Sequence, residues 1–238
     1  DSTSGGLLFA GGDSTYTGVI SGGGTVTQAG GTTTLSGVNT YTGTTTVSGG
    51  ELRVGVNNAI DDSSIVNQTG GIISFEDGVV ETFHSLNASG GTLQMGTTDG
   101  AGAADLTLLN NSNVHEIRVG TNSFLRLAPG VTLTQSSGTG TSQLGLGDSL
   151  TFDIGAGGRA EITGAINTGD GGGAINKTGS GTLLLSGNSS RFGGGTIIEN
   201  GVLEFTSIAD YDSASSLGDG DGQDGTDPPN NDALIQIG

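Results

Sequence analysis

One acidic stretch near the end of the chain has the residue types and the spacing of a cation site. Asp219, Asp221, Asp224 and Asp227 stand two or three residues apart in a glycine-rich segment. Hard cations such as Ca²⁺ take carboxylate oxygens from loops of this kind. The stretch lacks the glutamate that closes an EF-hand loop, since Asn230 holds the twelfth position counted from Asp219. Two interpretations follow: a calcium site, or a solvated acidic loop that opposes association.

The histidines and serines give no comparable signal for catalysis. His115 has an acidic neighbour, Glu116, but His84 and His115 do not stand at metal-ligand spacing. A Ser-His-Asp triad is defined in space rather than in sequence, so abundant serines indicate nothing. The lysine that completes a phosphate-binding loop is missing from every glycine-rich stretch. We expect no nucleophilic catalysis and histidines that are solvated or at strand edges.

The composition excludes further classes of site. The chain of 238 residues has no cysteine, which rules out disulfides and thiolate metal sites. It has 24 acidic against 6 basic side chains, and the resulting net charge is -18. This charge repels phosphate backbones and anionic lipids, so we expect no binding to nucleic acid or to a membrane surface.

The same sequence phrase occurs twice. Thr32–Val54 (TTTLSGVNTYTGTTTVSGGELRV) returns as Thr182–Phe205 (TLLLSGNSSRFGGGTIIENGVLEF), with one residue inserted. Upstream, Gly24–Gln28 (GTVTQ) aligns with Gly173–Lys177 (GAINK). The two repeat blocks therefore cover residues 17–54 and 163–205, and internal repetition of this kind is typical of solenoids.

Residues 31–52 closely resemble the passenger-associated repeat of bacterial autotransporters. The recurring phrase of that family contains glycine, threonine, LSG, NTYTG, paired threonines and a GG-x-L ending, and Gly31–Leu52 nearly spells it out. The resemblance implies a right-handed parallel β-helix passenger domain that is carried to the surface of a Gram-negative bacterium. It also implies that a signal peptide and an outer-membrane barrel lie outside this sequence.

The spacing of short apolar patterns independently predicts an all-β solenoid. An apolar–any–apolar pattern begins at residues 52, 73, 93, 117 and 144, in steps of 21, 20, 24 and 27, and later starts fall at 162, 183 and 203. Such steps fit coils of two or three short strands that stack only on their neighbours. We predict one domain over residues 1–238, a parallel β-helix of about ten coils with glycine at its corners. A β-sandwich is the alternative, because its strands look similar locally.

Alternation within the strands predicts which side chains are buried. We expect five of them to stack as aliphatic columns inside the coils: Leu52, Leu93, Ile117, Leu144 and Leu203. Their charged and polar neighbours in the sequence are predicted to face water. Aspartate at any of the five positions is expected to lower the melting temperature clearly.

Some segments depart from this rhythm. We predict protruding loops at residues 61–62, 76–81 and 99–105, and an acidic loop or linker at 207–231. Three aromatic residues near Thr-Gly or Gly-Gly corners are predicted to pack there rather than to stack on sugars: Tyr16, Tyr41 and Phe192.

These observations predict a structural protein that is not an enzyme. We expect a stalk segment of an autotransporter-like surface protein, which supports adhesion or display and folds vectorially during export. We expect no cofactor apart from calcium. One alternative is a carbohydrate-active β-helix enzyme, whose densest candidate charges are Asp148, Asp153, Arg159 and Glu161. The other is a self-assembling extracellular fibre subunit.

The end strands predict the partners. Gly6–Ala10 and Leu234–Ile237 are mostly apolar, and open strand edges recruit other strands. We expect weak end-to-end self-association, which salt or Ca²⁺ promotes by screening or bridging carboxylates. The other predicted partners are flanking coils of the same chain, the outer-membrane barrel, and a host or neighbouring-cell surface.

Overall fold

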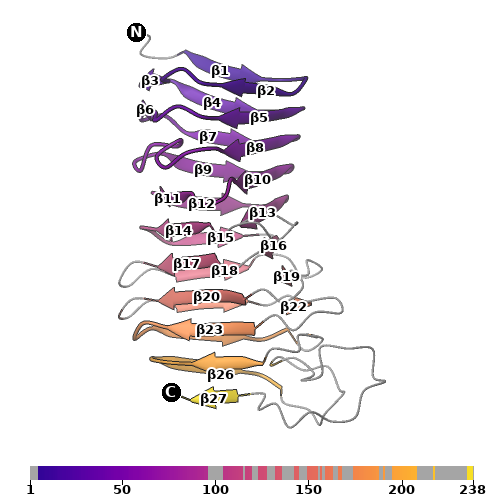
Figure 1. The fold of residues 1–238 in the computed structure, drawn as a ribbon, viewed down its shortest axis with the longest axis vertical. Helices are drawn as coiled ribbons and strands as arrows, with labels where there is room; N and C mark the ends of the chain where they lie inside the picture. The colour runs from indigo at the N-terminus through magenta and orange to yellow at the C-terminus, as the bar shows by residue number, and fades with distance from the viewer. Residues whose placement is uncertain are drawn as a thin grey trace.

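The chain forms a stack of parallel strands along one long axis, with the N terminus at one end and the C terminus at the other (Figure 1). The computed structural model describes residues 5–95, 104–114, 116–119, 123–127, 132–135, 142–144, 149–154, 156, 159–162, 166–167, 174–187, 190, 195–207, 217 and 235–237. Within these ranges the secondary structure is entirely β, and every strand pair is parallel. The predicted class, an all-β solenoid, is confirmed.

Three faces make up the solenoid. The first face is a sheet of ten strands: β1 (Gly6–Phe9), β4 (Thr25–Gln28), β7 (Thr45–Val47), β9 (Ile65–Gln68), β12 (Ser85–Ala88), β15 (Ser112–Val114), β18 (Thr132–Gln135), β21 (Arg159–Ile162), β24 (Thr182–Leu185) and β26 (Val202–Phe205). The second face has eight strands: β2 (Ser14–Tyr16), β5 (Thr32–Leu35), β8 (Glu51–Val54), β10 (Ile72–Phe75), β13 (Thr92–Met95), β16 (Glu116–Val119), β19 (Ser142–Leu144) and β22 (Ile166–Asn167). The third face has seven strands: β11 (Val80–Phe83), β14 (Asp105–Leu108), β17 (Ser123–Leu127), β20 (Ser149–Ile154), β23 (Ala174–Thr178), β25 (Thr196–Ile198) and β27 (Ile235–Ile237). Before β11, the third face carries the separate pair β3 (Ser21–Gly22) and β6 (Thr40–Tyr41).

The number of coils depends on the face that is counted. The first sheet has ten described strands, but the third has seven, so the turns with a strand there are fewer than the predicted ten or so. The difference of three arises because β3 and β6 form a separate pair, and because residues 55–64, in the coil after β6, form turns rather than a strand. The handedness of the helix stays a prediction.

The predicted register holds over the first coils and then fails. Leu52 pairs with Ile73, Ile73 with Leu93, and Leu93 with Ile117, as the steps of 21, 20 and 24 require. Leu144, however, pairs with Val119 rather than with Ile117.

The later starts at 162, 183 and 203 lie on a different face from the earlier ones. They belong to β21, β24 and β26 of the first face, and Leu183 pairs with Ala160 rather than with Ile162. The prediction of one continuous column was wrong because an apolar–any–apolar strand occurs on every face, so the pattern alone does not say which face a strand occupies.

Burial follows the predicted alternation where the side chains are described. Leu52 and Leu93 are 0% and 1% exposed, as predicted. Leu203 is only partly buried, because β26 is the last described strand of its sheet and is covered from one side. The side chains of Ile117 and Leu144 lie outside the described part of the chain.

Two of the predicted loops are partly strands. Glu81 lies in β11 and is fully buried, so only the start of segment 76–81 forms a turn. Asp105 lies in β14, and residues 99–103 are not described. Asp61 and Asp62 lie in a turn, as predicted. The loop prediction was wrong for Glu81 and Asp105 because the sequence does not distinguish an acidic residue in a strand from one in a solvated loop.

Glycine is required at the corner between the first and second faces. Gly31 and Gly50 have φ of 67° and 65°, in the left-handed region that favours glycine. A Cβ on either residue would lie 2.2 Å from the carbonyl oxygen of the coil before, Gly12 O and Gly31 O respectively. The predicted role of glycine at the corners is therefore confirmed here, with close stacking as an additional reason.

Candidate functional site

The sequence-based calcium site lies outside the described residues. This applies to all four ligands, Asp219, Asp221, Asp224 and Asp227, and the calcium site stays a prediction. In the part of the chain that the structure describes, no group of three or more His, Asp or Glu side chains could hold a metal ion. His84 is half-buried beside the Asn110 amide, with Nδ2 3.3 Å from the ring nitrogens, and His115 is not described.

Four charged residues were candidates for the catalytic group of the enzyme alternative, and those that the structure describes do not lie together. They are Asp148, Asp153, Arg159 and Glu161, of which Asp148 is outside the described residues. Asp153 lies on the third face, 3.8 Å from Arg126 Nε. Arg159 and Glu161 lie on the first face, where Arg159 Nη1 is 2.8 Å from Glu204 Oε2. The described carboxylates are thus on separate faces and do not form a catalytic pair.

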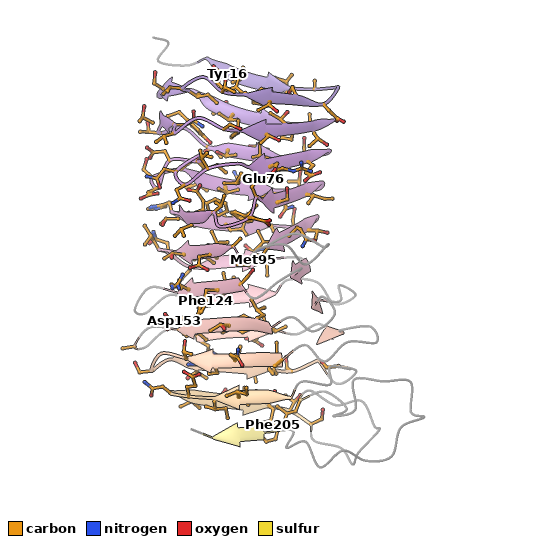
Figure 2. The ribbon with its side chains drawn as sticks, in the orientation of Figure 1. Tyr16, Glu76, Met95, Phe124, Asp153 and Phe205 are labelled. Carbon is orange, nitrogen blue, oxygen red and sulfur yellow. The ribbon has the colours of Figure 1, made fainter. Side chains whose placement is uncertain are left out.

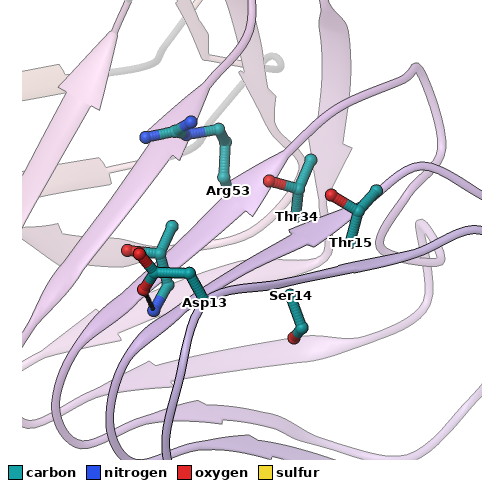
Figure 3. Close-up of a pocket in the computed structure, with 6 residues that line it drawn as sticks. Asp13, Ser14, Thr15, Thr34 and Arg53 are labelled. Atoms are coloured by element: carbon teal, nitrogen blue, oxygen red, sulfur yellow. Dashed lines mark hydrogen bonds between the residues drawn. The ribbon is translucent and has the colours of Figure 1, made fainter.

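A polar hollow of about 350 Å³ lies on the second face near the N-terminal end (Figure 3). It is lined by Asp13, Ser14, Thr15, Thr32, Thr34 and Arg53. Strand register places Thr15, Thr34 and Arg53 in one outward row along the axis.

The charged groups of this hollow already have partners. Arg53 lies 3.0 Å from Glu51 Oε1 and 3.6 Å from Glu76 Oε1, and Asp13 Oδ1 accepts a 3.0 Å hydrogen bond from the Thr32 backbone N–H. The hollow therefore offers hydrogen bonds to a polar ligand rather than a poised acid and base.

Buried polar side chains at the corners are a second kind of site. Gln28, at the end of β4, is 0% exposed, and its Nε2 donates to the carbonyl oxygens of Gly30 and Gly31, each at 2.9 Å. Gln68, at the end of β9, donates in the same way to Gly71 O at 3.2 Å and to Thr92 O at 3.0 Å. These amides satisfy carbonyl oxygens that turn inward where the chain leaves one face for the next.

Lys177 performs the same task in the second repeat. Its side chain is fully buried, and Nζ donates to the carbonyl oxygens of Thr178, Gly179 (2.7 Å) and Asn200 (3.2 Å). Burial lowers the pKa of the ammonium from its usual value, and the nearby Asp153 partly opposes that shift. The alignment of Lys177 with Gln28 was visible in the sequence, but its burial was not.

On the third face, side chains replace a strand that is missing between β6 and β11. Residues 57–60 form turns, and the backbone of Ala59 is held from both sides. Asn39 donates from Nδ2 to Ala59 O, and its Oδ1 accepts from the Ile20 N–H at 2.7 Å. From the other side, Glu81 Oε2 accepts from the Ala59 N–H at 3.1 Å. The Asn39 amide and the Glu81 carboxyl group thus make the hydrogen bonds to Ala59 that neighbouring strands would make in a continuous sheet.

The carboxyl group of Glu81 is strongly perturbed. Its pKa is raised to about 8: burial is the main cause and Asp62 adds to the rise, while hydrogen bonds from the backbone N–H groups of Thr82, Ala59 and Ile60 oppose it. Burial also raises the pKa of the nearby Tyr41 to about 12. Tyr41 packs in the interior and shares a hydrogen bond with Thr45, so its predicted corner packing is confirmed.

The two other aromatic residues were predicted to pack in the same way. Tyr16 is half-buried and packs edge to face on Phe9, with ring centroids 6.1 Å apart. Phe192 lies outside the described residues.

Comparison with known proteins identifies the repeated phrase. Residues 30–54 and 175–205 match the passenger-associated-transport-repeat, as predicted from the sequence. No curated protein and no solved structure matches the chain. None of the described segments is a helix of the length and apolar character that crossing a membrane requires.

Proposed function

We propose that this chain is a stalk segment of an autotransporter passenger, which displays or supports an adhesive region at the surface of a Gram-negative bacterium. The observation that carries the proposal is the coincidence of the two transport repeats with stacked coils of one β-solenoid. Both matches supply stacked strands; the second includes the buried Lys177 at its corner, and the buried Gln28 stands just before the first. The repeat is therefore part of the stacked strands that build the rod.

The architecture also supports vectorial folding during export. Each coil pairs with the coil before and the coil after it, so a chain that emerges from one end can fold by adding one coil at a time. No thiol has to be oxidised on the way, because the chain has no cysteine. Charged side chains on the described outward surface pair with one another, as Arg53 does with Glu51 and Arg126 with Asp105, which suits a spacer more than a catalyst.

The test is surface display. The chain is placed between a signal peptide and an autotransporter barrel in a Gram-negative host, with an epitope tag at its N-terminal end. We expect the tag to be accessible to antibody and to protease on intact cells. As a control, Leu93→Asp places a charge at a position that is 1% exposed and should reduce the displayed amount through misfolding. Retention of the well-folded parent chain inside the cell would contradict the proposal.

A further inference from the structure

We propose that Asn200 is a modification site, whose side-chain amide is lost without an enzyme through a cyclic imide formed with the backbone nitrogen of Gly201. The proposal does not depend on the stalk function. Asn200 is followed by glycine, and no other asparagine in the sequence is. Glycine has no Cβ that would hinder attack by its nitrogen on the preceding side chain. Asn200–Gly201 therefore has the residue types that this reaction needs.

The fold itself keeps glycine at position 201. Gly201 has φ of 83°, in the left-handed region, and a Cβ on it would lie 2.4 Å from Gly181 O of the coil before. A larger residue after Asn200 would slow the formation of the imide, but the stacked backbone leaves no room for one. The corner thus preserves the reactive pair.

The Asn200 side chain lies against the nitrogen that would attack it. The Gly201 N–H donates to Asn200 Oδ1 at 2.7 Å. The N–H groups of Glu199 and Val202, on either side, donate instead to carbonyl oxygens of the coil before. The carbon to be attacked, Cγ, is bonded to the oxygen that the Gly201 N–H contacts. The two reacting atoms are therefore held close together by the corner.

Lys177 activates the same nitrogen through the peptide bond. Its Nζ donates to Asn200 O at 3.2 Å, and this oxygen belongs to the peptide group that contains Gly201 N. When the nitrogen loses its proton, resonance places negative charge on that oxygen. An ammonium that donates to the oxygen stabilises this charge, as a preorganised donor does in an enzyme. Lys177 is fully buried, so water screens the contact only weakly.

The reaction balances as a hydrolysis. Gly201 N forms a bond with Asn200 Cγ, the bond from Cγ to Nδ2 breaks, and ammonia leaves with the proton of the Gly201 N–H. Water then opens the ring. Opening at Cγ gives aspartate, whereas opening at the backbone carbonyl carbon gives isoaspartate, whose main chain is one atom longer. Overall, one water enters and one ammonia leaves.

The first repeat block shows that water reaches this corner position inside the stack. Gly49 and Gly50 align with Asn200 and Gly201. Gly49 follows β7, which has strands on both sides, and it is still only half-buried. That corner lacks both reactive features, because glycine stands in place of asparagine and the uncharged Gln28 in place of lysine. The site therefore belongs to the second block alone.

Isoaspartate would loosen the coil that it enters. Phe205, labelled in Figure 2, ends β26 and shows where this coil lies. A Cβ on Gly201 would meet both Gly181 O, at 2.4 Å, and Gly179 O, at 2.5 Å, so the two corners are in close contact. An extra main-chain atom at 200 disturbs that contact and the register of β26 on β24. The reaction thus lowers the stability of the second block with time.

Peptide mapping by mass spectrometry, on chain incubated at neutral pH and digested at mildly acidic pH, tests the proposal. In the folded parent we expect Asn200 to react before any other asparagine, and to give both aspartate and isoaspartate. Lys177→Gln keeps an uncharged donor, as at Gln28, and should slow the reaction about tenfold. In denaturing urea, where the corner is absent, the parent and Lys177→Gln should react at equal rates.

Asn200→Gly is the matched control, because glycine stands at the equivalent position 49. Its melting temperature should stay constant during the incubation, whereas that of the parent should fall by about 2 °C or more. Circular dichroism checks that each variant folds, and the order of reaction in the parent decides the proposal even if Lys177→Gln does not. Other asparagines reacting before Asn200 would overturn the proposal. So would equal rates for folded parent and folded Lys177→Gln, a lasting bond from Lys177 to Asn200, or cleavage of the chain after residue 200.

Discussion

The two repeat blocks, residues 17–54 and 163–205, close corresponding corners with different chemistry. Gln28 and Lys177 occupy equivalent positions, and both are fully buried against backbone carbonyls. The corner presents acceptors only. Lysine has three donors and no acceptor, whereas glutamine brings an acceptor of its own, and Gln28 Oε1 has no partner among the described residues. In both copies a buried side chain donates hydrogen bonds to the corner carbonyls. The copies differ because glutamine leaves its own oxygen without a partner among the described residues, whereas lysine has no acceptor to satisfy.

The two copies also occupy different faces. In the first repeat, Gln28 ends β4 on the first face and leads to β5 on the second. In the second repeat, Lys177 lies in β23 on the third face and leads to β24 on the first. The second copy is therefore rotated by one face relative to the first. A transport repeat specifies a strand, a corner and the next strand, and it does not specify a position around the axis.

The largest expected effect tests whether the copies are equivalent in the core. Leu35 and Leu185 align in the repeat and are 0% and 1% exposed. Leu35→Asp and Leu185→Asp should each cost about 4 kcal/mol or more, because an unpaired charge is placed among aliphatic side chains. Urea denaturation followed by circular dichroism measures both. Effects that differ severalfold would show that the two copies do not pack alike.

A smaller effect should separate the two corners. Lys177→Met leaves three buried carbonyls without their donor and should cost about 3 kcal/mol. Gln28→Met loses two hydrogen bonds but also removes the unpartnered amide oxygen, so it should cost about 1 kcal/mol. The same denaturation assay compares them. A larger loss at Gln28 than at Lys177 would refute the account of the corners.

The pH dependence of stability should have opposite signs for two buried groups, Glu81 in the first half of the chain and Lys177 in the second. Glu81 has a pKa of about 8 in the fold, above its ordinary value of 4.5, so the folded state holds a proton that the unfolded chain loses. The stability from this group is complete below pH 4.5 and is lost as the pH rises through about 8. Between about pH 6.5 and 8 the loss should be about 2 kcal/mol. The charged neighbour that contributes to this shift is Asp62.

Lys177 should act in the opposite direction. Its pKa is lowered in the fold, so the unfolded chain binds the proton more tightly and stability from this group rises with pH toward 10.5. Melting temperatures across the pH range measure both slopes. Glu81→Gln should remove the loss between pH 4.5 and about 8, and Lys177→Gln should remove the gain toward pH 10.5. Parallel melting curves for the parent and Glu81→Gln would contradict the burial of an ionisable carboxyl group.

The fold class was predictable because stacking leaves a simple trace in the sequence. Each coil shows short strands and glycine corners, and successive coils repeat at a coil-sized step. The strand register from Leu52 to Ile117 followed from these features. The face of each strand was not predictable. Coils differ in length, and a two-residue change at Leu144 shifts the register without changing the local pattern.

The buried polar groups were not predictable for a different reason. Glu81 stands in an acidic run that reads as a solvated loop, and it is buried because residues 57–60 form no strand beside it. Lys177 aligned with Gln28, but only the path of the backbone shows which carbonyls turn inward. For Glu81 the cause of burial is distant in the sequence, where local patterns carry no information, and for Lys177 one of the three carbonyls, Asn200 O, is distant as well.

Disulfide trapping tests the rotation of the second repeat most directly, and the chain has no cysteine to interfere. In the structure, Leu184 of β24 pairs with Glu161 of β21 on the first face. Without rotation, β24 would instead follow β22 on the second face, beside Asn167. Glu161→Cys with Leu184→Cys should form a disulfide under mild oxidation, as should the first-face control pair Thr27→Cys with Thr46→Cys. Asn167→Cys with Leu184→Cys should not. A bond between Cys variants at 167 and 184, found by peptide mass spectrometry in place of the 161–184 bond, would contradict the account.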